Sequence, residues 1–292
     1  MMRRRVLIIV NPAAGGLCCS WRRLDRVVAA LRRRGCTVIA RRTSPEGGDA
    51  ERLARDAEPD FDIIVAAGGD GTLNAVANGL AGGERALGVL PLGTVNVLAR
   101  EIGLPRHTEA LAELILAGAA RPIWPGRVDG RLFLMMASSG FDAEIVAAVN
   151  PRLKRRFGRL AFAWAMAVGW WRYRASRLSV RIGDADYSAA GVIAANGRFY
   201  AGPYIVAPQA DLAAPMLDLV LLRRAGRVAM LRYLTALVLG RLAQRDDIAI
   251  VRAAEAHLSA EAPLPVQADG EIVARLPVRI AIAERPVWLV QP

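Results

Sequence analysis

A glycine-rich turn constrains the fold of this chain more than any other feature of its sequence. The apolar run Ile63–Ala67 has the length of a buried strand. It is followed by Gly68-Gly69-Asp70-Gly71 and by a helical pattern that opens at Thr72. Glycine lets an anion approach the backbone closely, and the first turn of a helix offers N–H groups with partial positive charge. The sequence therefore predicts a phosphate-binding junction between a strand and a helix.

Asp70 lies inside this turn and has two interpretations. Like charges repel strongly where water is excluded, so a carboxylate that faces a polyphosphate predicts a divalent ion or a proton-accepting role. Alternatively, Asp70-Gly71 is a tight turn in which Asp70 caps the following helix. The turn alone leaves both interpretations open.

Two further turns follow other apolar runs in the same half of the chain. Asn11-Pro12-Ala13-Ala14-Gly15-Gly16 comes after the run 6–10, and Pro91-Leu92-Gly93-Thr94-Val95-Asn96 ends the run 87–91. Thr43 follows the run 36–40 and lies either at the same edge or on the ordinary surface. Ligands of an open α/β sheet bind beyond the carboxyl ends of its strands. We therefore expect the turns to converge on one nucleotide.

The distribution of strands and helices predicts two domains. Residues 1–125 alternate strands with helical spacing at 24–31, 72–80 and 94–102, the pattern of a doubly wound parallel sheet. Residues 126–283 are richer in strands, expected at 132–137, 179–182, 191–195, 217–222 and 264–268. Helical segments at about 152–175 and 227–244 interrupt this second part. A length of 292 residues is compatible with two domains.

The net positive charge of the chain limits the classes of partner that it is expected to bind. A net charge of +12 favours phosphates, nucleic acid or an acidic membrane surface, and no nucleic-acid-binding module is recognised. Cys18, Cys19 and Cys36 lack the spacing of a zinc site or disulfide framework. The run 6–10 is too short for an export signal, and the run 160–171 is too short to cross a bilayer. We expect a cytoplasmic protein that contacts the membrane only from one side.

The segment 152–175 combines basic residues with an apolar stripe at helical spacing. Such a helix suits the interface between water and anionic headgroups. The residues expected to contact the membrane are Arg155, Arg156, Arg159, Trp164 and Trp171. The alternative is a helix that packs its stripe on the second domain and leaves its basic face in water.

Several motifs together make the chain resemble the diacylglycerol kinase-like family, which includes bacterial lipid kinases, sphingosine kinases and ceramide kinases. They occur in the family's order and span nearly the whole chain. The matching motifs are Val10-Asn11-Pro12-Ala13-Ala14-Gly15-Gly16, Gly68-Gly69-Asp70-Gly71-Thr72-Leu73-Asn74-Ala75-Val76-Ala77-Asn78-Gly79-Leu80, Leu90-Pro91-Leu92-Gly93-Thr94-Val95-Asn96-Val97-Leu98-Ala99-Arg100, Gly140-Phe141-Asp142-Ala143 and Asp269-Gly270-Glu271.

The resemblance implies a fold and a reaction. The fold is an α/β nucleotide-binding domain like that of phosphofructokinases and NAD kinases at 1–125, joined by a last strand at about 284–292. A β-sandwich lipid-substrate domain follows at 126–283, with the active site in the interdomain cleft. The reaction is transfer of the γ-phosphate of ATP, with Mg²⁺, to a lipid hydroxyl. The nucleotide-binding residues implied are Asn11, Pro12, Gly15, Thr43, Gly68, Gly69, Asp70, Gly71, Thr72, Asn74, Gly93, Thr94 and Asn96.

Phosphoryl transfer to an alcohol needs a group that accepts the hydroxyl proton. Asp70, Asp269 and Glu271 are the candidates, because the resemblance assigns this role to a carboxylate of the Asp269 motif or to the aspartate of the first glycine turn. On local grounds alone, Asp269-Gly270 is a hairpin signal. Metal ligation is expected of Asp70, and Asp218 is a second candidate.

Three departures from the family pattern remove carboxylates. Val97, Trp124 and Ala214-Pro215 stand where aspartates are common in the family. In some bacterial members those acids organise a structural magnesium ion, so we do not expect a well-formed second metal site here. Asp218 remains, and Asp211 is a partial substitute.

Two other classes of function compete with a lipid kinase. A soluble NAD or sugar kinase shares the glycine turn, but the Gly93-Thr94-Val95-Asn96 and Asp269-Gly270-Glu271 motifs favour a lipid acceptor. A catalytically weak, membrane-bound regulator would explain the missing carboxylates. The expected partners are a lipid substrate, in the first place diacylglycerol or a related lipid alcohol, and an anionic membrane surface. The sequence does not decide whether the chain forms a homodimer.

Overall fold

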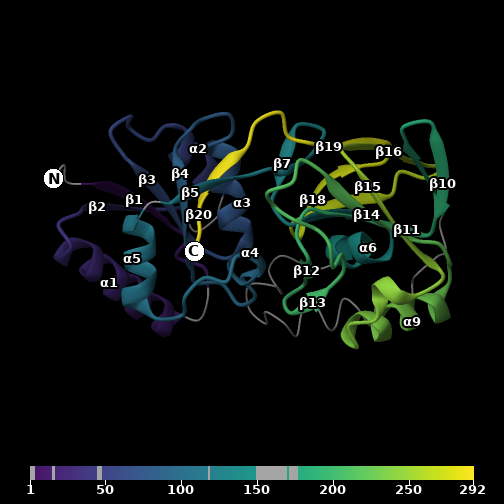
Figure 1. Cartoon of the computed structure of the whole chain (residues 1–292), viewed down its shortest axis with the longest axis horizontal. Coiled ribbons are helices and arrows are strands. Elements are labelled where there is room, and N and C mark those ends of the chain that lie inside the picture. The colour runs from purple at the N-terminus through teal and green to yellow at the C-terminus, as the bar shows by residue number, and fades with distance from the viewer. Residues whose placement is uncertain (1–3, 15–16, 45–47, 118, 149–169, 171–176) are drawn as a thin grey trace. The chain divides into compact units, whose positions relative to one another are not determined.

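The computed structural model describes residues 4–14, 17–44, 48–117, 119–148, 170 and 177–292. The chain divides into two compact units (Figure 1). Unit 1 comprises residues 1–123 and 284–292, and unit 2 comprises residues 124–283. Each unit has its own sheets and its own core, so each is described by itself.

Unit 1 is built on a largely parallel sheet. Its strand order is β2-β1-β3-β4-β20-β5, in which β20 runs parallel to β4 and antiparallel to β5. The strands are β1 (Arg5–Val10), β2 (Thr37–Arg42), β3 (Ile63–Gly68), β4 (Ala86–Pro91), β5 (Ala120–Ile123) and β20 (Val287–Val290). The helices are α1 (Leu17–Arg33), α2 (Ala50–Arg55), α3 (Asp70–Gly79), α4 (Val97–Glu101) and α5 (Thr108–Ala117).

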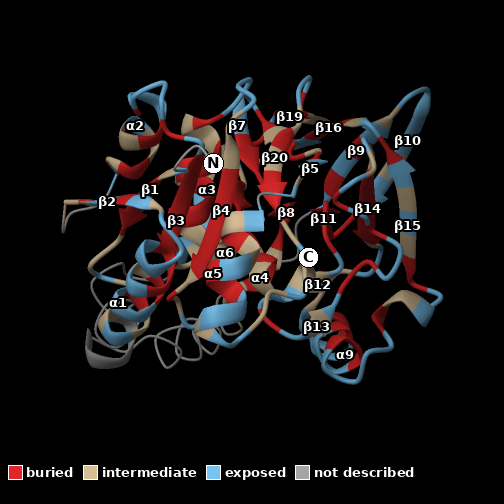
Figure 2. Ribbon diagram, turned by 60° about the vertical axis from the view of Figure 1, so that its left-hand side comes forward, coloured by how far each residue is buried: buried red, intermediate tan, exposed pale blue. Residues whose placement is uncertain are grey.

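The central strands of unit 1 are buried on both faces, as expected of a sheet covered by helices on both sides. Figure 2 shows β3 and β4 buried over most of their length. Alternate residues of β1 point to one face, where Val6 and Ile8 pack against Leu31 of α1 and Leu111 of α5. This packing holds the carboxyl ends of β1, β3 and β4 side by side.

Unit 2 is a β-sandwich of two mainly antiparallel sheets. Their strand orders are β10-β9-β16-β19-β6-β7 and β15-β14-β11-β8-β17-β18. The inward side chains of both sheets share one core, in which Val180 and Leu258 of the first sheet cluster with Val192 and Leu219 of the second. The strands are β6 (Gly126–Val128), β7 (Arg131–Phe133), β8 (Met136–Ser139), β9 (Leu178–Ile182), β10 (Ala185–Ala189), β11 (Gly191–Ala195), β14 (Leu217–Leu222), β15 (Ile248–Ala253), β16 (Glu255–Ala260), β17 (Pro265–Ala268), β18 (Glu271–Arg275) and β19 (Val278–Ile282).

Shorter elements complete unit 2. They are the helices α6 (Phe141–Ala148) and α9 (Arg227–Val238), the 3₁₀ turn η1 (Leu242–Gln244), and the small hairpin of β12 (Phe199–Tyr200) and β13 (Tyr204–Ile205). Among the helices in the described ranges, none combines the length and the apolar character that a membrane crossing requires.

Three predicted elements differ from the structure. The strand expected at 132–137 is broken into β7 and β8, which belong to different sheets. The helix expected at 94–102 begins only at Val97, because Asn96 has a left-handed conformation with φ 52°. The helix expected at 227–244 ends at Val238, and Gly240 follows with φ 68°. In the last two cases a left-handed residue interrupts the helical path.

Candidate active site

The three predicted turns of unit 1 are joined by backbone hydrogen bonds. The Asn11 N–H donates to the Ala67 carbonyl at 3.0 Å, which ties the turn after β1 to the end of β3. The N–H groups of Leu92 and Gly93 donate to the Gly68 carbonyl at 2.9 and 3.1 Å, which ties the turn after β4 to the same place. The turns therefore form one connected surface at the carboxyl edge of the sheet.

Asn11 also holds the start of α3. Its side-chain Nδ2 donates to Thr72 Oγ1 at 3.0 Å, while its Oδ1 accepts the Ala13 N–H at 2.9 Å. Pro12 lies in the same turn and is half-buried, whereas Gly15 lies outside the described residues. Asn11 thus positions the first turn of α3 relative to β1.

The glycines allow a close approach between two turns. A Cβ atom on Gly93 would lie 2.5 Å from Gly69 Cα, and one on Gly68 would lie 2.5 Å from Thr72 Oγ1. Only hydrogen atoms fit in these places, because the backbone of Gly69 excludes a side chain at position 93 and the Thr72 side chain excludes one at position 68. The close approach leaves the N-terminus of α3, with Gly69 as its N-cap, at the carboxyl edge of the sheet.

Asp70 caps a helix, but not the helix to which it belongs. Its Oδ1 accepts the Val97 N–H at 2.7 Å, at the first residue of α4. Asn96 supports this arrangement, because its Oδ1 accepts the Gly93 N–H at 3.1 Å and its Nδ2 donates to the Gly93 carbonyl at 2.7 Å. Since position 97 contributes its backbone N–H, the departure to valine leaves this bond intact.

The remaining predicted nucleotide residues differ in exposure. Thr72 and Asn74 are buried on α3, Thr94 is exposed, and Gly71 is half-buried in the first turn of the helix. Within the described ranges, the buried hydroxyl of Thr43 has no hydrogen-bond partner, although its N–H donates to the Val10 carbonyl at 2.8 Å. A buried unpaired hydroxyl costs about 1–3 kcal/mol, so Thr43 is a suitable donor for a ligand.

The carboxylate of Asp269 in unit 2 accepts three backbone hydrogen bonds. The donors are the N–H groups of Leu134 at 2.6 Å and of Met135 and Met136 at 3.0 Å each. Asp269 has φ 47° and forms the tight turn between β17 and β18 with Gly270. These three bonds use oxygen lone pairs that a proton acceptor needs. They also explain why the strand expected at 132–137 is interrupted between β7 and β8.

Glu271 is the other carboxylate of the motif, and it is exposed at the first residue of β18. It follows the rigid turn directly and lies opposite Ala268 in the register of β17 and β18. Of the two carboxylates, Glu271 is thus the one that the structure leaves accessible.

Asp142 lies in the family-like motif Gly140-Phe141-Asp142-Ala143, and a series of hydrogen bonds connects it to the same turn. Its carboxylate accepts bonds from Ser138 and, at 3.4 Å, from Tyr200. Gln267 continues the chain, since its Nε2 donates to Ser138 Oγ at 2.5 Å and its Oε1 accepts the Gly270 N–H at 2.9 Å.

Burial is the main cause of the pKa shifts of the ionisable groups at and beside Asp142. It raises the pKa of the Asp142 carboxyl above its usual range, against the hydrogen bonds from Ser138 and Tyr200. The pKa of Tyr200 lies well above its ordinary value because of burial and the neighbouring Asp142. Burial and Asp142 also raise the pKa of Glu144.

Asp218 does not fit a metal site. It is buried on β14 and pairs with Arg252, which lies directly opposite on β15, through Nε at 2.8 Å and Nη2 at 3.4 Å. The guanidinium already supplies the positive charge that this buried carboxylate requires. Moreover, the described part of the chain contains no group of three His, Cys, Asp or Glu residues that could hold a metal ion.

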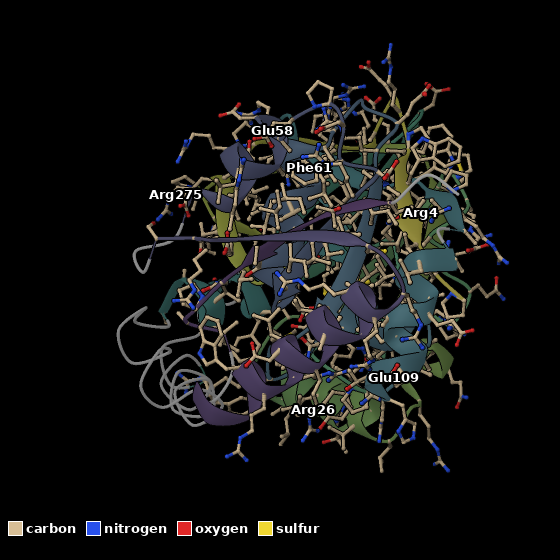
Figure 3. All side chains as sticks on the ribbon, turned by 90° about the vertical axis from the view of Figure 1, so that its left-hand side faces the viewer. Arg4, Arg26, Glu58, Phe61, Glu109 and Arg275 are labelled. Atoms are coloured by element: carbon tan, nitrogen blue, oxygen red, sulfur yellow. The ribbon has the colours of Figure 1, made fainter. Side chains whose placement is uncertain are left out.

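The expected membrane-contact residues Arg155, Arg156, Arg159, Trp164 and Trp171 lie outside the described residues. A hollow of about 460 Å³ between α1 and α5 is lined by Arg26 and Glu109 (Figure 3), but Glu109 is engaged there by Arg33 and Arg34 at 2.5 and 2.6 Å. That hollow is separate from the turns.

Comparison with known proteins covers both units. Residues 5–128 match the diacylglycerol kinase catalytic domain, and residues 135–290 match the YegS C-terminal NAD kinase beta sandwich-like domain. The chain is 29% identical to a diacylglycerol kinase of Bacillus subtilis over 99% of its own length and 97% of that protein. It is 37% identical to a Pseudomonas aeruginosa protein named "Probable lipid kinase YegS-like", over 68% of this chain and 67% of that one.

A solved structure has the same fold. The crystal structure of a diacylglycerol kinase from Bacillus anthracis superposes with a TM-score of 0.78 at 24% identity. The match covers 100% of this chain and 98% of that one.

Proposed function

The chain belongs to the family of diacylglycerol kinase-like lipid kinases, phosphotransferases with an alcohol acceptor, and we propose that it transfers the γ-phosphate of ATP to diacylglycerol or a closely related lipid alcohol. The observation that carries the proposal is the convergence of three hydrogen-bonded turns on Asp70 and the N-terminus of α3. A helix N-terminus at the carboxyl edge of a sheet binds phosphate groups.

The residues of unit 1 are assigned to the nucleotide. The first N–H groups of α3 and the unpaired hydroxyl of Thr43 donate to ATP oxygens, and Asn11 keeps α3 in place. Asp70 is the residue that would hold Mg²⁺ together with the phosphates, as one carboxylate suffices when phosphate oxygens complete the shell. The ion would neutralise charge on the phosphates.

Glu271 of unit 2 is assigned the role of general base. It takes the proton of the lipid hydroxyl while that oxygen forms a bond to the γ-phosphorus and the bond from this phosphorus to the β–γ bridging oxygen breaks. Asp269 holds the turn that presents Glu271, because its own acceptor positions are occupied by three backbone N–H groups. This division of roles explains why the motif contains two carboxylates.

The lipid acceptor implies that the enzyme works at a membrane. We propose peripheral association with the inner face of the membrane, where diacylglycerol is accessible from the cytoplasm. The basic segment 152–175 remains a predicted contact. Fractionation of cells into soluble and membrane pools with and without high salt tests this location, because a peripheral protein is released by salt.

The reaction is tested with purified protein, labelled ATP and a panel of acceptors. Diacylglycerol, ceramide, a sphingoid base and a bacterial glycolipid precursor are presented in mixed micelles, and NAD is added as the soluble alternative. We expect magnesium-dependent labelling of diacylglycerol. Exclusive labelling of NAD, or no labelling of any acceptor, would contradict the proposal.

Variants test the assigned residues. Asp70→Asn should abolish turnover while binding to anionic vesicles stays intact. Glu271→Gln should lower kcat by about 10²–10⁴, the usual contribution of a general base. Asp184→Asn, an exposed carboxylate in the turn between β9 and β10, is the matched control and should behave as wild type. Equal turnover by Glu271→Gln would remove Glu271 from the mechanism.

A further inference from the structure

Helix α9 of unit 2 is apolar on two opposite faces. Its inner face is buried against unit 2 (Figure 1, lower right) through Ala229, Met230, Tyr233, Ala236 and Leu237. The hydroxyl of Tyr233 accepts the Arg224 N–H at 2.9 Å and donates to the Asp247 carbonyl at 3.3 Å. The inner face therefore anchors the helix to the rest of unit 2.

The outer face of α9 exposes large apolar side chains to solvent. The exposed fractions are 64% for Val228, 51% for Leu231, 36% for Leu234, 54% for Val238 and 63% for Leu239. Spacings of three and four residues place Val228, Leu231, Leu234 and Val238 on one side of the helix. A helix that is apolar all round is normally buried, and an exposed apolar patch marks an interaction surface.

The charged residues along this helix and its flanks are arginines up to position 245, where Asp246 and Asp247 follow. Residues 223–245 contain Arg223, Arg224, Arg227, Arg232, Arg241 and Arg245, and they contain no lysine, aspartate or glutamate. Arg223, Arg227, Arg232 and Arg241 are exposed. Arg224 and Arg245 pair with Asp247 at 3.7 and 2.7 Å. At 3.6 residues per turn, Arg227 and Arg232 lie towards opposite borders of the apolar stripe. The outer face thus has an apolar centre and a basic rim.

We propose that the outer face of α9 docks unit 2 on an anionic lipid bilayer. The apolar side chains enter the acyl boundary, and the arginines contact the headgroup phosphates, which is the arrangement of a helix that lies in a membrane interface. A second copy of the chain is a poorer occupant, because the two basic rims would face each other and repel. The purpose of the docking, access to a lipid substrate, rests on the proposed function; the binding itself does not.

The binding is tested with vesicles that contain no kinase substrate. Sedimentation compares vesicles of equal parts phosphatidylglycerol and phosphatidylcholine with vesicles of phosphatidylcholine alone. The apolar variant is Val228→Ser/Leu231→Ser/Val238→Ser, and the charge variant is Arg227→Glu/Arg232→Glu. Their controls are Ile39→Ser, an exposed isoleucine of unit 1, and Arg26→Glu/Arg121→Glu, which changes the net charge equally.

Both α9 variants should bind the mixed vesicles about tenfold more weakly, or worse, than wild type, and both controls should bind as wild type. Raising the salt concentration should reduce the difference between wild type and the charge variant. Unchanged binding of either α9 variant would overturn the proposal, and so would failure of the wild-type protein to bind the mixed vesicles. All these side chains are exposed, so the melting temperatures should agree.

Two further measurements separate the alternatives. If sedimentation equilibrium without vesicles shows a dimer that the apolar variant converts to a monomer, while vesicle binding is unchanged, a second copy covers this face and the proposal is wrong. Turnover of a short-chain, water-soluble diacylglycerol should be the same for wild type and both α9 variants. Vesicle binding that depends on α9 without such turnover by any of them would support the docking and refute the proposed function.

Discussion

Asp269 is predicted to stabilise unit 2 rather than to accept a proton, and replacing it by alanine tests this. The substitution leaves the N–H groups of Leu134, Met135 and Met136 without their acceptor. All three residues are at most 6% exposed. An unsatisfied buried donor costs about 1–3 kcal/mol, and water can reach part of this turn because Asp269 itself is half-buried. We therefore expect a loss of about 3–4 kcal/mol.

The loss is large enough to measure by thermal unfolding. Unit 2 spans residues 124–283, a size at which 1 kcal/mol shifts the melting temperature by about 2–4 °C, so Asp269→Ala should lower the transition of unit 2 by about 10 °C. Asp269→Asn keeps the shape but points an amide donor at backbone donors, and it should cost about 2 kcal/mol. Circular dichroism and calorimetry measure the melting temperature of unit 2 in both variants.

Glu271→Gln is the matched comparison, because Glu271 is exposed and follows the same turn. It should change the stability of unit 2 by less than about 0.5 kcal/mol while removing most of the activity. The opposite pattern would refute the reasoning: Asp269→Asn with wild-type stability and no turnover, together with an active Glu271→Gln, would make Asp269 the base.

Three other predictions concern the nucleotide, the metal and pH. Thr43→Val removes the unpaired buried hydroxyl at nearly constant volume, so steady-state kinetics should show a higher KM for ATP while the melting temperature without nucleotide does not fall. Arg252→Met leaves Asp218 buried without its cation and should lower the free energy of unfolding measured in urea, by less than in a fully buried pair because the Arg252 side chain is 46% exposed. Mg²⁺ without nucleotide should not shift the wild-type melting temperature. Arg279 lowers the pKa of Glu255 from 4.5 to about 2. The stability that this carboxylate contributes is therefore present above pH 4.5 and is lost as the pH falls towards 2. Glu255→Gln should flatten that part of a curve of unfolding free energy against pH, and an unchanged curve would contradict the assignment.

The fold class was predictable because its signals are local. The apolar run before Gly68, the glycines after it and the helical pattern from Thr72 each occupy a few consecutive residues, and the structure has β3 and α3 there. The division into an α/β half and a β-rich half is also readable from the period of apolar residues. The comparisons agree with both halves.

The misplaced boundaries have tertiary causes. The run 132–137 has the composition of one strand, but Asp269, more than 130 positions later, accepts hydrogen bonds from the N–H groups of Leu134 and Met135, which lie between β7 and β8, and of Met136, the first residue of β8. Likewise, α9 has an apolar pattern that predicts a helix, and only the solvent exposure of Val228 and Leu231 distinguishes its outer face from its inner face.

The sequence alone predicts a phosphate-binding turn that contains Asp70 in an α/β domain, a second β-rich domain, and two further candidate carboxylates beside Gly270. The three-dimensional arrangement was needed to distinguish these three carboxylates: Asp70 caps α4 at Val97, Asp269 accepts bonds from backbone donors, and Glu271 is accessible. The physical reason is that hydrogen bonds between distant residues depend on strand order and register. Local patterns of apolar residues encode neither of these.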